Sequence, residues 1–316
     1  MRLIGLFVLF LMLHACNKSV VVSVQKDSPT FEKNVIYPMV IAHRGGQLEA
    51  PENTLYAFDK AIKIGVDGIE LDVQLSKDLV PVLYHPKDLS AKTNEKGPVS
   101  SLTVAELKQL NAGYNFTSDG QNYPFRGDNS SLGIPTLEEA FKNIPKNIFI
   151  IIDFKSLPAG PLVDAVLKTV DATNEWDRVL FYSTSNEHMD ILAKENRAIL
   201  FEPRDITRSR LLQMAIHDNC DKPLKYYPWM GFELNRKMTV SEKFQLGEGH
   251  TTLDMNLWNE KTMQCIKEAQ TKCKVSLFGI NTKEDYISAT KLGVDAVYTD
   301  CPEKIVQIKN AKTQLK

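Results

Sequence analysis

The chain has 316 residues, of which 43% are hydrophobic and 24% charged, a balance typical of a globular protein with a large core. Its formal net charge of −1, with no long run of lysine and arginine, argues against a nucleic-acid partner. The five cysteines contain no CxxC pair and no spacing to histidine that suits structural zinc. We expect free or buried thiols, with pairing among Cys220, Cys265, Cys273 and Cys301 as the alternative.

The first fifteen residues have the pattern of a secretion signal. Arg2 precedes an apolar run over residues 3–13 that is too short to span a bilayer, and the run leads into LHAC. This ending resembles a bacterial lipobox, which predicts removal of residues 1–15, lipidation of Cys16 and a lipid anchor to a membrane of the bacterial cell envelope, on its periplasmic or outer surface. A plain secretory signal is the alternative. Residues 16–37 are mostly polar and predict a flexible tether.

From residue 38 to residue 316, short apolar runs alternate with helical patterns, which predicts one α/β domain with a parallel sheet. The expected strands are 39–42, 67–73, 80–84, 148–154, 178–182, 198–202, 274–278 and 294–299. The expected helices are 54–64, 103–111, 137–143, 160–173, 186–195, 207–216, 259–271 and 283–291. Thr103 with Glu106, and Thr136 with Glu139, fit the capping box that begins a helix.

Eight strands with interspersed helices predict a (β/α)8 TIM barrel. A doubly wound open sheet is the alternative, but the Gly45-Gly46 pair after the first strand lacks the third glycine of a dinucleotide-binding loop. Residues 86–135 contain one helical pattern and many turn-forming residues, so we expect an excursion after the third strand that covers the barrel mouth. Residues 217–257 are ambiguous, because both MGFEL and TTLDM fit a strand.

Polar side chains collect where the first four expected strands end, and in a barrel the catalytic groups come from these carboxyl ends. Alternate residues of a strand face the same side, so Glu70 lies with Asp72, and Asp153 lies with Lys155. The collected residues are His43, Arg44, Glu70, Asp72, His85, Asp153 and Lys155.

The three carboxylates Glu70, Asp72 and Asp153 would repel one another in a barrel mouth, and burial without a partner is unfavourable. A divalent cation explains them, and ligation by oxygen alone favours Mg²⁺ or Ca²⁺, with Mn²⁺ as a further candidate. The alternative is that they only form ion pairs with Arg44 and Lys155. Beside a metal, these two cations would instead hold an anion such as phosphate.

Two histidines at strand ends beside carboxylates supply the acid and base that phosphoester cleavage needs near neutral pH. These are His43 and His85. His188 and His217 lie in helical patterns and His250 in a Gly-rich stretch, so we expect packing or surface roles for them.

The order of these motifs resembles the glycerophosphodiester phosphodiesterase family, whose fold is a TIM barrel. HRG, PENT, a helix, GIELDV, a histidine after an apolar strand and an acid-x-Lys strand follow one another. Near the end, LFGINTKEDYISATKLGVDAVYTDCP is similar to the family's last strand-helix-strand unit, with Asn281 and Asp300 at its polar positions. The resemblance covers most of residues 39–303 and is weakest over 203–257.

The resemblance implies hydrolysis of glycerophosphodiesters to glycerol 3-phosphate and an alcohol. One histidine would activate a nucleophile, either water or a substrate hydroxyl, and the other would protonate the departing alkoxide. The implied roles are acid-base catalysis for His43 and His85, metal binding for Glu70, Asp72 and Asp153, phosphate contact for Arg44 and Lys155, and a polar active-site neighbour for Glu52.

Three positions depart from the family pattern. Pro86 follows His85 where the family has aspartate, Leu79 follows Asp78 where the family has glycine, and Asp153 replaces a glutamate. Two other hypotheses therefore stay open. One is a degenerate barrel that binds phosphorylated lipid headgroups or envelope glycans without turnover, and the other is a phospholipase D-like enzyme that acts on intact membrane lipid.

Overall fold

The computed structural model describes residues 37–127, 132–217, 220 and 225–313, all of which belong to the compact unit Ile36–Lys316. The expected signal segment, Cys16 and nearly all of the expected tether lie outside the described residues. No helix in the described part of the chain is both long enough and apolar enough to cross a lipid bilayer.

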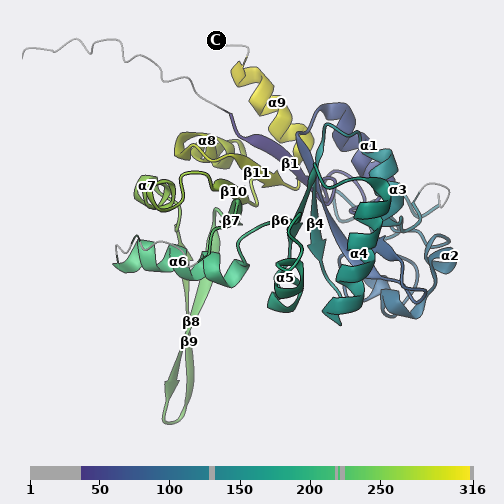
Figure 1. Ribbon diagram of the computed structural model, residues 1–316, viewed down its shortest axis with the longest axis horizontal. Coiled ribbons are helices and arrows are strands. Elements are labelled where there is room, and N and C mark those ends of the chain that lie inside the picture. Colours follow the sequence, from purple (N-terminus) through teal and green to yellow (C-terminus); the bar gives the residue numbers. More distant parts are fainter. Residues whose placement is uncertain (1–36, 128–131, 218–219, 221–224, 314–316) are drawn as a thin grey trace, which may run out of the picture. The chain divides into compact units, whose positions relative to one another are not determined.

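Eight parallel strands form a nearly closed barrel (Figure 1). They are hydrogen-bonded in the order β6-β5-β4-β2-β1-β11-β10-β7, and a parallel bridge between Phe201 and Trp229 joins the two ends of this order. The expected (β/α)8 barrel is therefore confirmed. Its strands are β1 (Met39–His43), β2 (Gly68–Leu75), β4 (Phe149–Phe154), β5 (Val179–Tyr182), β6 (Ile199–Leu200), β7 (Trp229–Glu233), β10 (Lys274–Phe278) and β11 (Ala296–Thr299).

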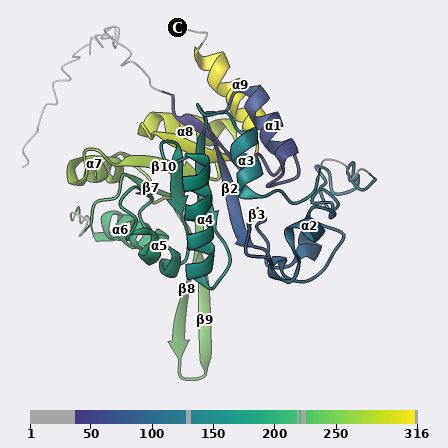
Figure 2. The same cartoon turned by 45° about the vertical axis from the view of Figure 1, so that its right-hand side comes forward.

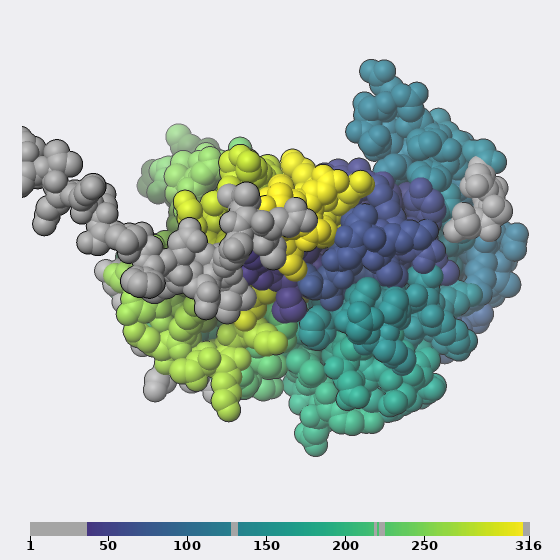
Figure 3. All heavy atoms as spheres, turned by 90° about the horizontal axis from the view of Figure 1, so that it is seen from above, coloured from purple at the N-terminus to yellow at the C-terminus, as the bar shows by residue number. Residues whose placement is uncertain are grey.

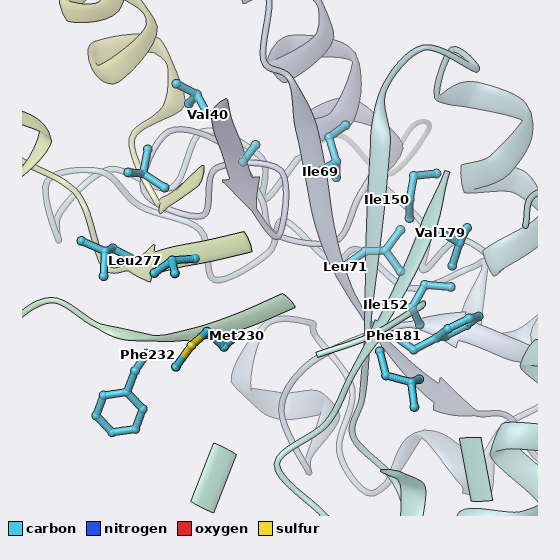
Figure 4. Close-up of a cluster of buried hydrophobic side chains, with 14 of the residues drawn as sticks. Val40, Ile69, Leu71, Ile150, Ile152, Val179, Phe181, Met230, Phe232 and Leu277 are labelled. Carbon is cyan, nitrogen blue, oxygen red and sulfur yellow. The ribbon is translucent and has the colours of Figure 1, made fainter. Parts of the chain in front are cut away.

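The barrel strands alternate between an outer and an inner face, as the period of a strand requires. Outward side chains such as Val40, Leu71 and Phe181 belong to one cluster (Figure 4). The same cluster includes Phe58 and Leu162 of the surrounding helices. A second cluster fills the barrel interior and consists of Ile41, Ile151, Leu180, Tyr182, Phe201, Trp229, Ala296 and Tyr298. The barrel interior is thus filled by side chains, and a cavity is expected only above the carboxyl ends of the strands.

The helices begin close to the predicted residues, and side-chain caps explain several of the starts. Both predicted capping boxes are present, at Thr103 with Glu106 and at Thr136 with Glu139, although α2 is much shorter than predicted. The final helix, α9, was not predicted, although Pro302 at its first position is a typical start signal. The helices are α1 (Leu55–Ile64), α2 (Val104–Leu107), α3 (Leu137–Asn143), α4 (Ala159–Thr173), α5 (Asn186–Leu192), α6 (Arg204–His217), α7 (Glu260–Ala269), α8 (Lys283–Leu292) and α9 (Pro302–Thr313).

The expected third barrel strand, 80–84, is not part of the barrel. This segment forms β3 (Pro81–Leu83), which pairs antiparallel with the far end of β2. The reversal occurs at Leu79, which has a φ of 59° and whose backbone N–H donates a hydrogen bond to the Ser76 carbonyl at 3.0 Å, so the chain makes a tight turn. The barrel strand that takes the missing place is β7, which contains most of the ambiguous MGFEL segment.

The excursion after β3 has a small core of its own, which includes Val82, Leu89, Leu107 and Ile134. Figures 2 and 3 show this blue segment standing out on the side of the barrel where α1 and α3 lie. The other ambiguous segment, TTLDM, lies in the antiparallel hairpin of β8 (Arg236–Phe244) and β9 (Gly247–Met255), which extends away from the barrel (Figures 1 and 2).

The expectation of free thiols is wrong for one pair of cysteines, because Cys220 and Cys265 form a disulfide. Cys273 and Cys301 are free. The sequence could not decide this, because the 45 residues between the paired positions give no spacing signal.

A buried arginine before β5 supplies a first stability prediction. The Arg178 guanidinium, 6% exposed, pairs with Glu175 and donates to the carbonyls of Phe141 at 3.1 Å and Ile144 at 2.9 Å at the end of α3. We expect Arg178→Ala to lower the free energy of unfolding by about 3–5 kcal/mol, because it leaves the buried Glu175 carboxylate with Lys146 as its remaining cation and removes the donors to helix-terminal carbonyls. Urea denaturation measures this, and Arg197→Ala is the control.

Arg197 is half exposed and pairs with Asp171 and Glu195 at the surface, so its removal should change the urea midpoint little. Equal losses for the two variants would contradict the structural role given to Arg178.

Candidate active site

A cavity of about 400 Å³ opens above the carboxyl ends of the barrel strands. Five of the predicted site residues line it: His43, Arg44, Glu70, Asp153 and Lys155. Because they come from β1, β2 and β4 and from the residues that directly follow these strands, the barrel itself brings them together, as the sequence predicted.

The HRG motif is a sharp turn that leaves β1 and begins the site. Arg44, Gly45 and Gly46 all have positive φ, at 53°, 82° and 102°. A Cβ at Gly45 would lie 2.8 Å from the Ala57 side chain, and one at Gly46 would lie 2.6 Å from Pro302, so neither position has room for another residue. The turn directs the Arg44 amide at the Glu70 carboxylate, 2.9 Å away.

The three predicted metal ligands converge. Glu70, Asp72 and Asp153 each offer an oxygen within 4.8 Å of the others, and all three side chains are buried. Burial and the neighbouring Asp72 charge raise the pKa of Glu70, and burial raises the pKa of Asp153 despite the nearby Lys155 ammonium. The Oδ1 atom of Asp153 is buried with no hydrogen-bond partner among the described residues. This donor set fits a hard divalent cation.

Two cations lie against the same carboxylates, as the ion-pair alternative required. The Lys155 ammonium pairs with Asp153 and lies 3.2 Å from Asp72 Oδ1, while Arg44 Nε lies 3.1 Å from Asp72 Oδ2. Burial alone would raise the pKa of Asp72, but Lys155 and Arg44 outweigh it and hold this pKa below its usual value. If all three carboxylates are ionised, the two cations leave one excess negative charge, and this repulsion is one reason that the pKa of Glu70 is raised.

The PENT motif holds this cluster from the side of α1. Asn53 makes a reciprocal pair of hydrogen bonds with Asp72. The side-chain nitrogen of Asn53 donates to Asp72 Oδ2 at 2.8 Å, and its side-chain oxygen accepts from the Asp72 backbone N–H at 3.0 Å. Thr54 caps α1. Glu52 is buried and lies 3.5 Å from Arg44 and 2.9 Å from Lys92. The motif therefore fixes Asp72 and Arg44 in place.

The excursion reaches the site from one side and does not cover it. Lys92, which pairs with Glu52, belongs to this segment. Among the described residues, none that lines the cavity comes from 86–135, so the expectation of a cover over the mouth is wrong. The cause is β3: because it folds back along β2 outside the barrel, the chain that follows it starts beside the cavity.

His43 is held in one orientation by a carboxylate from the opposite end of the chain. Its Nδ1 lies 2.6 Å from Asp300 Oδ1, and its Nε2 faces Glu70 at 3.8 Å. Burial lowers the pKa of His43, but Glu70 and the Asp300 hydrogen bond outweigh burial and raise it. Asp300 itself also accepts hydrogen bonds from Gln47 at 2.7 Å and Asn281 at 2.9 Å. The His43–Asp300 pair was not predicted, since 257 residues separate its members.

His85 lies beside the cavity and is not among the residues that line it. Burial lowers the pKa of His85 to about 4, and the nearest charges that act on it include Asp72, Arg44 and Lys155. Its loop is fixed by Gln74, whose amide nitrogen donates to the Tyr84 carbonyl at 2.9 Å and the Pro86 carbonyl at 2.7 Å. The Gln74 side chain on β2 thus holds the His85 loop through hydrogen bonds to the loop's backbone carbonyls.

The other three histidines in the described part of the chain have the packing or surface positions that the sequence predicted. His188 is buried, with Nδ1 2.9 Å from the Ser183 hydroxyl and Nε2 2.9 Å from the Ser156 carbonyl. His217 ends α6, and His250 lies exposed on β9.

The far wall of the cavity was not predicted. It comes from β5, β7, β10, β11 and the start of α6, and of these only β7 and the start of α6 lie in the segment 203–257 where the resemblance was weakest. Arg204 pairs with Glu233 and lies over the Phe232 ring, 4.5 Å from its centroid. The residues that complete this wall are Tyr182, Thr184, Phe278, Gly279 and Tyr298.

Comparisons with known proteins agree with this geometry. The model of the glycerophosphoryl diester phosphodiesterase family matches residues 43–304. A glycerophosphodiester phosphodiesterase of Caldanaerobacter subterraneus is 31% identical, over 85% of this chain and 97% of its own. The Mycobacterium tuberculosis protein Rv2277c is 42% identical, over 84% of this chain and 87% of its own.

Solved structures give the same result. The glycerophosphoryl diester phosphodiesterase domain of Rv2277c superposes with a TM-score of 0.79 at 40% identity, covering 87% of this chain and all of that one. An Oleispira antarctica phosphodiesterase in complex with the product sn-glycerol-3-phosphate has a TM-score of 0.64 at 25% identity, covering 87% of this chain and 97% of that one. The chain described here therefore belongs to the glycerophosphoryl diester phosphodiesterase family and is a phosphodiesterase enzyme.

Proposed function

We propose that this enzyme hydrolyses glycerophosphodiesters to glycerol 3-phosphate and an alcohol, with a divalent metal ion and histidine acid-base catalysis. The observation that carries the proposal is the buried cluster of Glu70, Asp72 and Asp153 beside the His43–Asp300 pair in one cavity. The names of its relatives and the product in the Oleispira complex support the choice of substrate.

Glu70, Asp72 and Asp153 would hold the metal, for which Mg²⁺ and Ca²⁺ are the first candidates and Mn²⁺ the next. When bound, a divalent ion supplies Lewis-acid stabilisation of the charge that develops on the phosphoryl oxygens. Arg44 and Lys155, which line the same cavity, would contact the phosphate of the substrate. Glu52 would keep Arg44 in position from behind.

The two histidines would move the two protons of the reaction. Asp300 accepts the Nδ1 proton of His43, which leaves Nε2 directed into the site as the atom that exchanges a proton. His85 would serve as the second group, so that one histidine removes a proton from the nucleophile and the other protonates the departing alkoxide. The far wall around Arg204 and Glu233 leaves space for the rest of the substrate.

The role of Asp300 gives a prediction. Asp300→Asn keeps the shape but removes a charged hydrogen bond worth about 1.5–3 kcal/mol, so we expect kcat to fall roughly 10- to 100-fold. Steady-state hydrolysis measured over a range of pH checks this. The acidic limb of the pH profile should move to lower pH, since the pKa of His43 should fall when the carboxylate is lost. Asp285→Asn on α8 is the control, and a kcat unchanged in Asp300→Asn would contradict the role.

We also propose that Cys16 anchors the enzyme, through attached lipid, to a bacterial membrane on the periplasmic or outer surface. The support is the sequence alone: the apolar run over residues 3–13 and the LHAC ending. Growth with labelled palmitate and fractionation should place the wild-type chain in the membrane and Cys16→Ala in the soluble fraction. Label retained by Cys16→Ala would contradict the anchor.

Phosphorus NMR of the products tests the function against its two alternatives. The proposal predicts glycerol 3-phosphate from a water-soluble glycerophosphodiester and little turnover of micellar phospholipid. Preferential attack on the intact lipid, or a cyclic phosphate product, would favour the phospholipase D-like hypothesis. Binding without turnover would favour the degenerate barrel. One reason for that hypothesis is weakened, since Leu79 is 64% exposed in the β2–β3 turn and does not line the cavity.

A further inference from the structure

The β8–β9 hairpin has two chemically different faces. In an antiparallel pair, residues opposite one another share a face, and alternate residues share it along each strand. One face consists of Lys237 with Asp254, Thr239 with Thr252, Ser241 with His250 and Lys243 with Glu248. The other face consists of Arg236 with Met255, Met238 with Leu253, Val240 with Thr251, Glu242 with Gly249 and Phe244 with Gly247. We call these the polar face and the apolar face.

Two of the four cross-strand pairs of the polar face interact through their side chains. The Ser241 hydroxyl lies 2.9 Å from His250 Nδ1, and the Lys243 ammonium lies 4.0 Å from Glu248. Every pair on this face joins two polar side chains, and polar side chains are stable in contact with water. The polar face can therefore remain in contact with water without a partner.

The apolar face is left open by the rest of the described chain. Val240 is 47% exposed, Leu253 43% and Phe244 62%, although all three are large apolar side chains. The Phe244 ring lies across Gly249, where a Cβ would come within 2.6 Å of it, so a larger residue at position 249 would displace the ring. An isolated two-stranded hairpin is at best marginally stable in water, so this face needs a cover.

We propose that a second copy of this chain covers the apolar face, with the two hairpins packed face to face and running in opposite directions about a twofold axis. The apolar face carries one base and one acid, Arg236 near the barrel and Glu242 near the tip. In this arrangement Arg236 meets the partner's Glu242, and Met238 meets the partner's Val240. The face is thus complementary to itself in charge and in apolar character, which an isologous interface requires.

Within one chain, Arg236 and Glu242 have few ion-pair partners. Among the described residues, no ion pair involves Glu242, and Arg236, whose side chain is 49% exposed, lies 3.4 Å from Glu233. A twofold pairing gives Glu242 a partner and retains the apolar residues between the two charges as the centre of the contact. The charges would also fix the register, because a shift by two residues separates them.

A lipid surface fits the hairpin less well. The tip from residue 242 to residue 248 carries Glu242 and Glu248 against the single base Lys243. Anionic lipids attract basic segments and repel acidic ones, so this tip would be repelled from such a membrane. The exposed Phe244 and Leu246 at the tip instead lie where they would reach the base of the partner's hairpin.

The size of the face limits the strength of the contact. Nine-residue strands span ~30 Å, and a two-stranded ribbon about 10 Å wide therefore offers a footprint of roughly 300 Å². Stable interfaces bury roughly 800 Å² from each partner. We therefore infer a dimer that dissociates on dilution.

Sedimentation equilibrium of the full chain carrying Cys16→Ala tests this inference. The fraction of dimer is measured at protein concentrations from about 1 to about 100 μM. Val240→Lys and Leu253→Lys should each raise the dimer dissociation constant at least about tenfold, because a lysine buried in the contact lacks a partner. Thr239→Lys and Thr252→Lys add the same charge to the neighbouring positions of the polar face and should leave the dimer unchanged. Circular dichroism confirms that each variant is folded.

A charge exchange adds a test that misfolding cannot imitate. Glu242→Arg and Arg236→Glu should each weaken the dimer, and the double variant should restore it. A monomer at every concentration, a dimer insensitive to the apolar-face variants, or a double variant weaker than both singles would overturn the proposal. Flotation with neutral and anionic vesicles tests the lipid alternative. If no dimer forms and the protein binds vesicles, and Val240→Lys but not Thr239→Lys abolishes this binding, the apolar face contacts a lipid surface instead.

Discussion

Replacement of His43 by alanine is expected to lower kcat/KM for a glycerophosphodiester by about 10²- to 10⁴-fold, the usual contribution of a positioned acid or base. The reason is geometric. His43 lies between the Asp300 carboxylate and Glu70 and lines the cavity, so its Nε2 faces the acidic cluster where we propose that the phosphoester binds. Steady-state kinetics with a coupled assay for glycerol 3-phosphate measures the change.

The matched control is His250→Ala, since His250 lies exposed on β9, away from the cavity. It should retain wild-type kcat/KM, whereas His43→Ala should lose activity while its thermal unfolding stays cooperative. Near-normal turnover in folded His43→Ala would contradict the proposed proton transfer by this residue.

Neutralisation of Glu70 is expected to have the second large effect, this time on metal binding. Loss of an outer hydrogen-bond partner of a metal ligand lowers affinity about 10- to 100-fold, so loss of the ligand itself in Glu70→Gln should exceed that range. The apoprotein should not be destabilised. Burial and Asp72 raise the pKa of Glu70, which means that ionised Glu70 opposes folding at pH values above its unfolded pKa, and a neutral amide removes that opposition.

Isothermal titration with Mg²⁺ and Ca²⁺, together with thermal unfolding with and without the ions, separates these two effects. Wild type should gain stability on metal addition, and Glu70→Gln should not. Glu284→Gln, an exposed acid on α8, is the control and should bind as wild type does. Equal metal-induced stabilisation of Glu70→Gln and wild type would show that the cluster is not the metal site.

Much of this site could be read from local sequence because it is built from neighbouring strands. The period of a strand places Glu70 and Asp72 on one face, and the parallel register of β2 and β4 sets Asp72 beside Asp153. The turn after β1 needs both Gly45 and Gly46 because a Cβ at either position would clash, and the two glycines are visible in the sequence. These features depend on contacts a few residues apart, or on strand order alone.

The features that the sequence did not predict depend on distant or weakly patterned segments. The Asp300 carboxylate reaches His43 only because β11 and β1 are adjacent when the barrel closes. The run over 80–84 has strand character, but its pairing direction was decided by the Leu79 turn, at a residue type that rarely takes positive φ. Glycine at that position would have signalled the turn more clearly.

The Arg204–Glu233 wall was missed for a similar reason. Glu233 ends β7, which could not be separated by pattern from the hairpin strand that contains TTLDM. The parallel pairing of β7 with β10 and the Phe201–Trp229 bridge distinguish the barrel strand from the hairpin.

The most direct test of the account is the release of glycerol 3-phosphate from a purified glycerophosphodiester before chelation, after removal of metal, and after its return. We predict that chelation abolishes release, that Mg²⁺, Ca²⁺ or Mn²⁺ restores it in wild type, and that no ion restores it in Glu70→Gln. Undiminished release from metal-free enzyme would contradict the central claim.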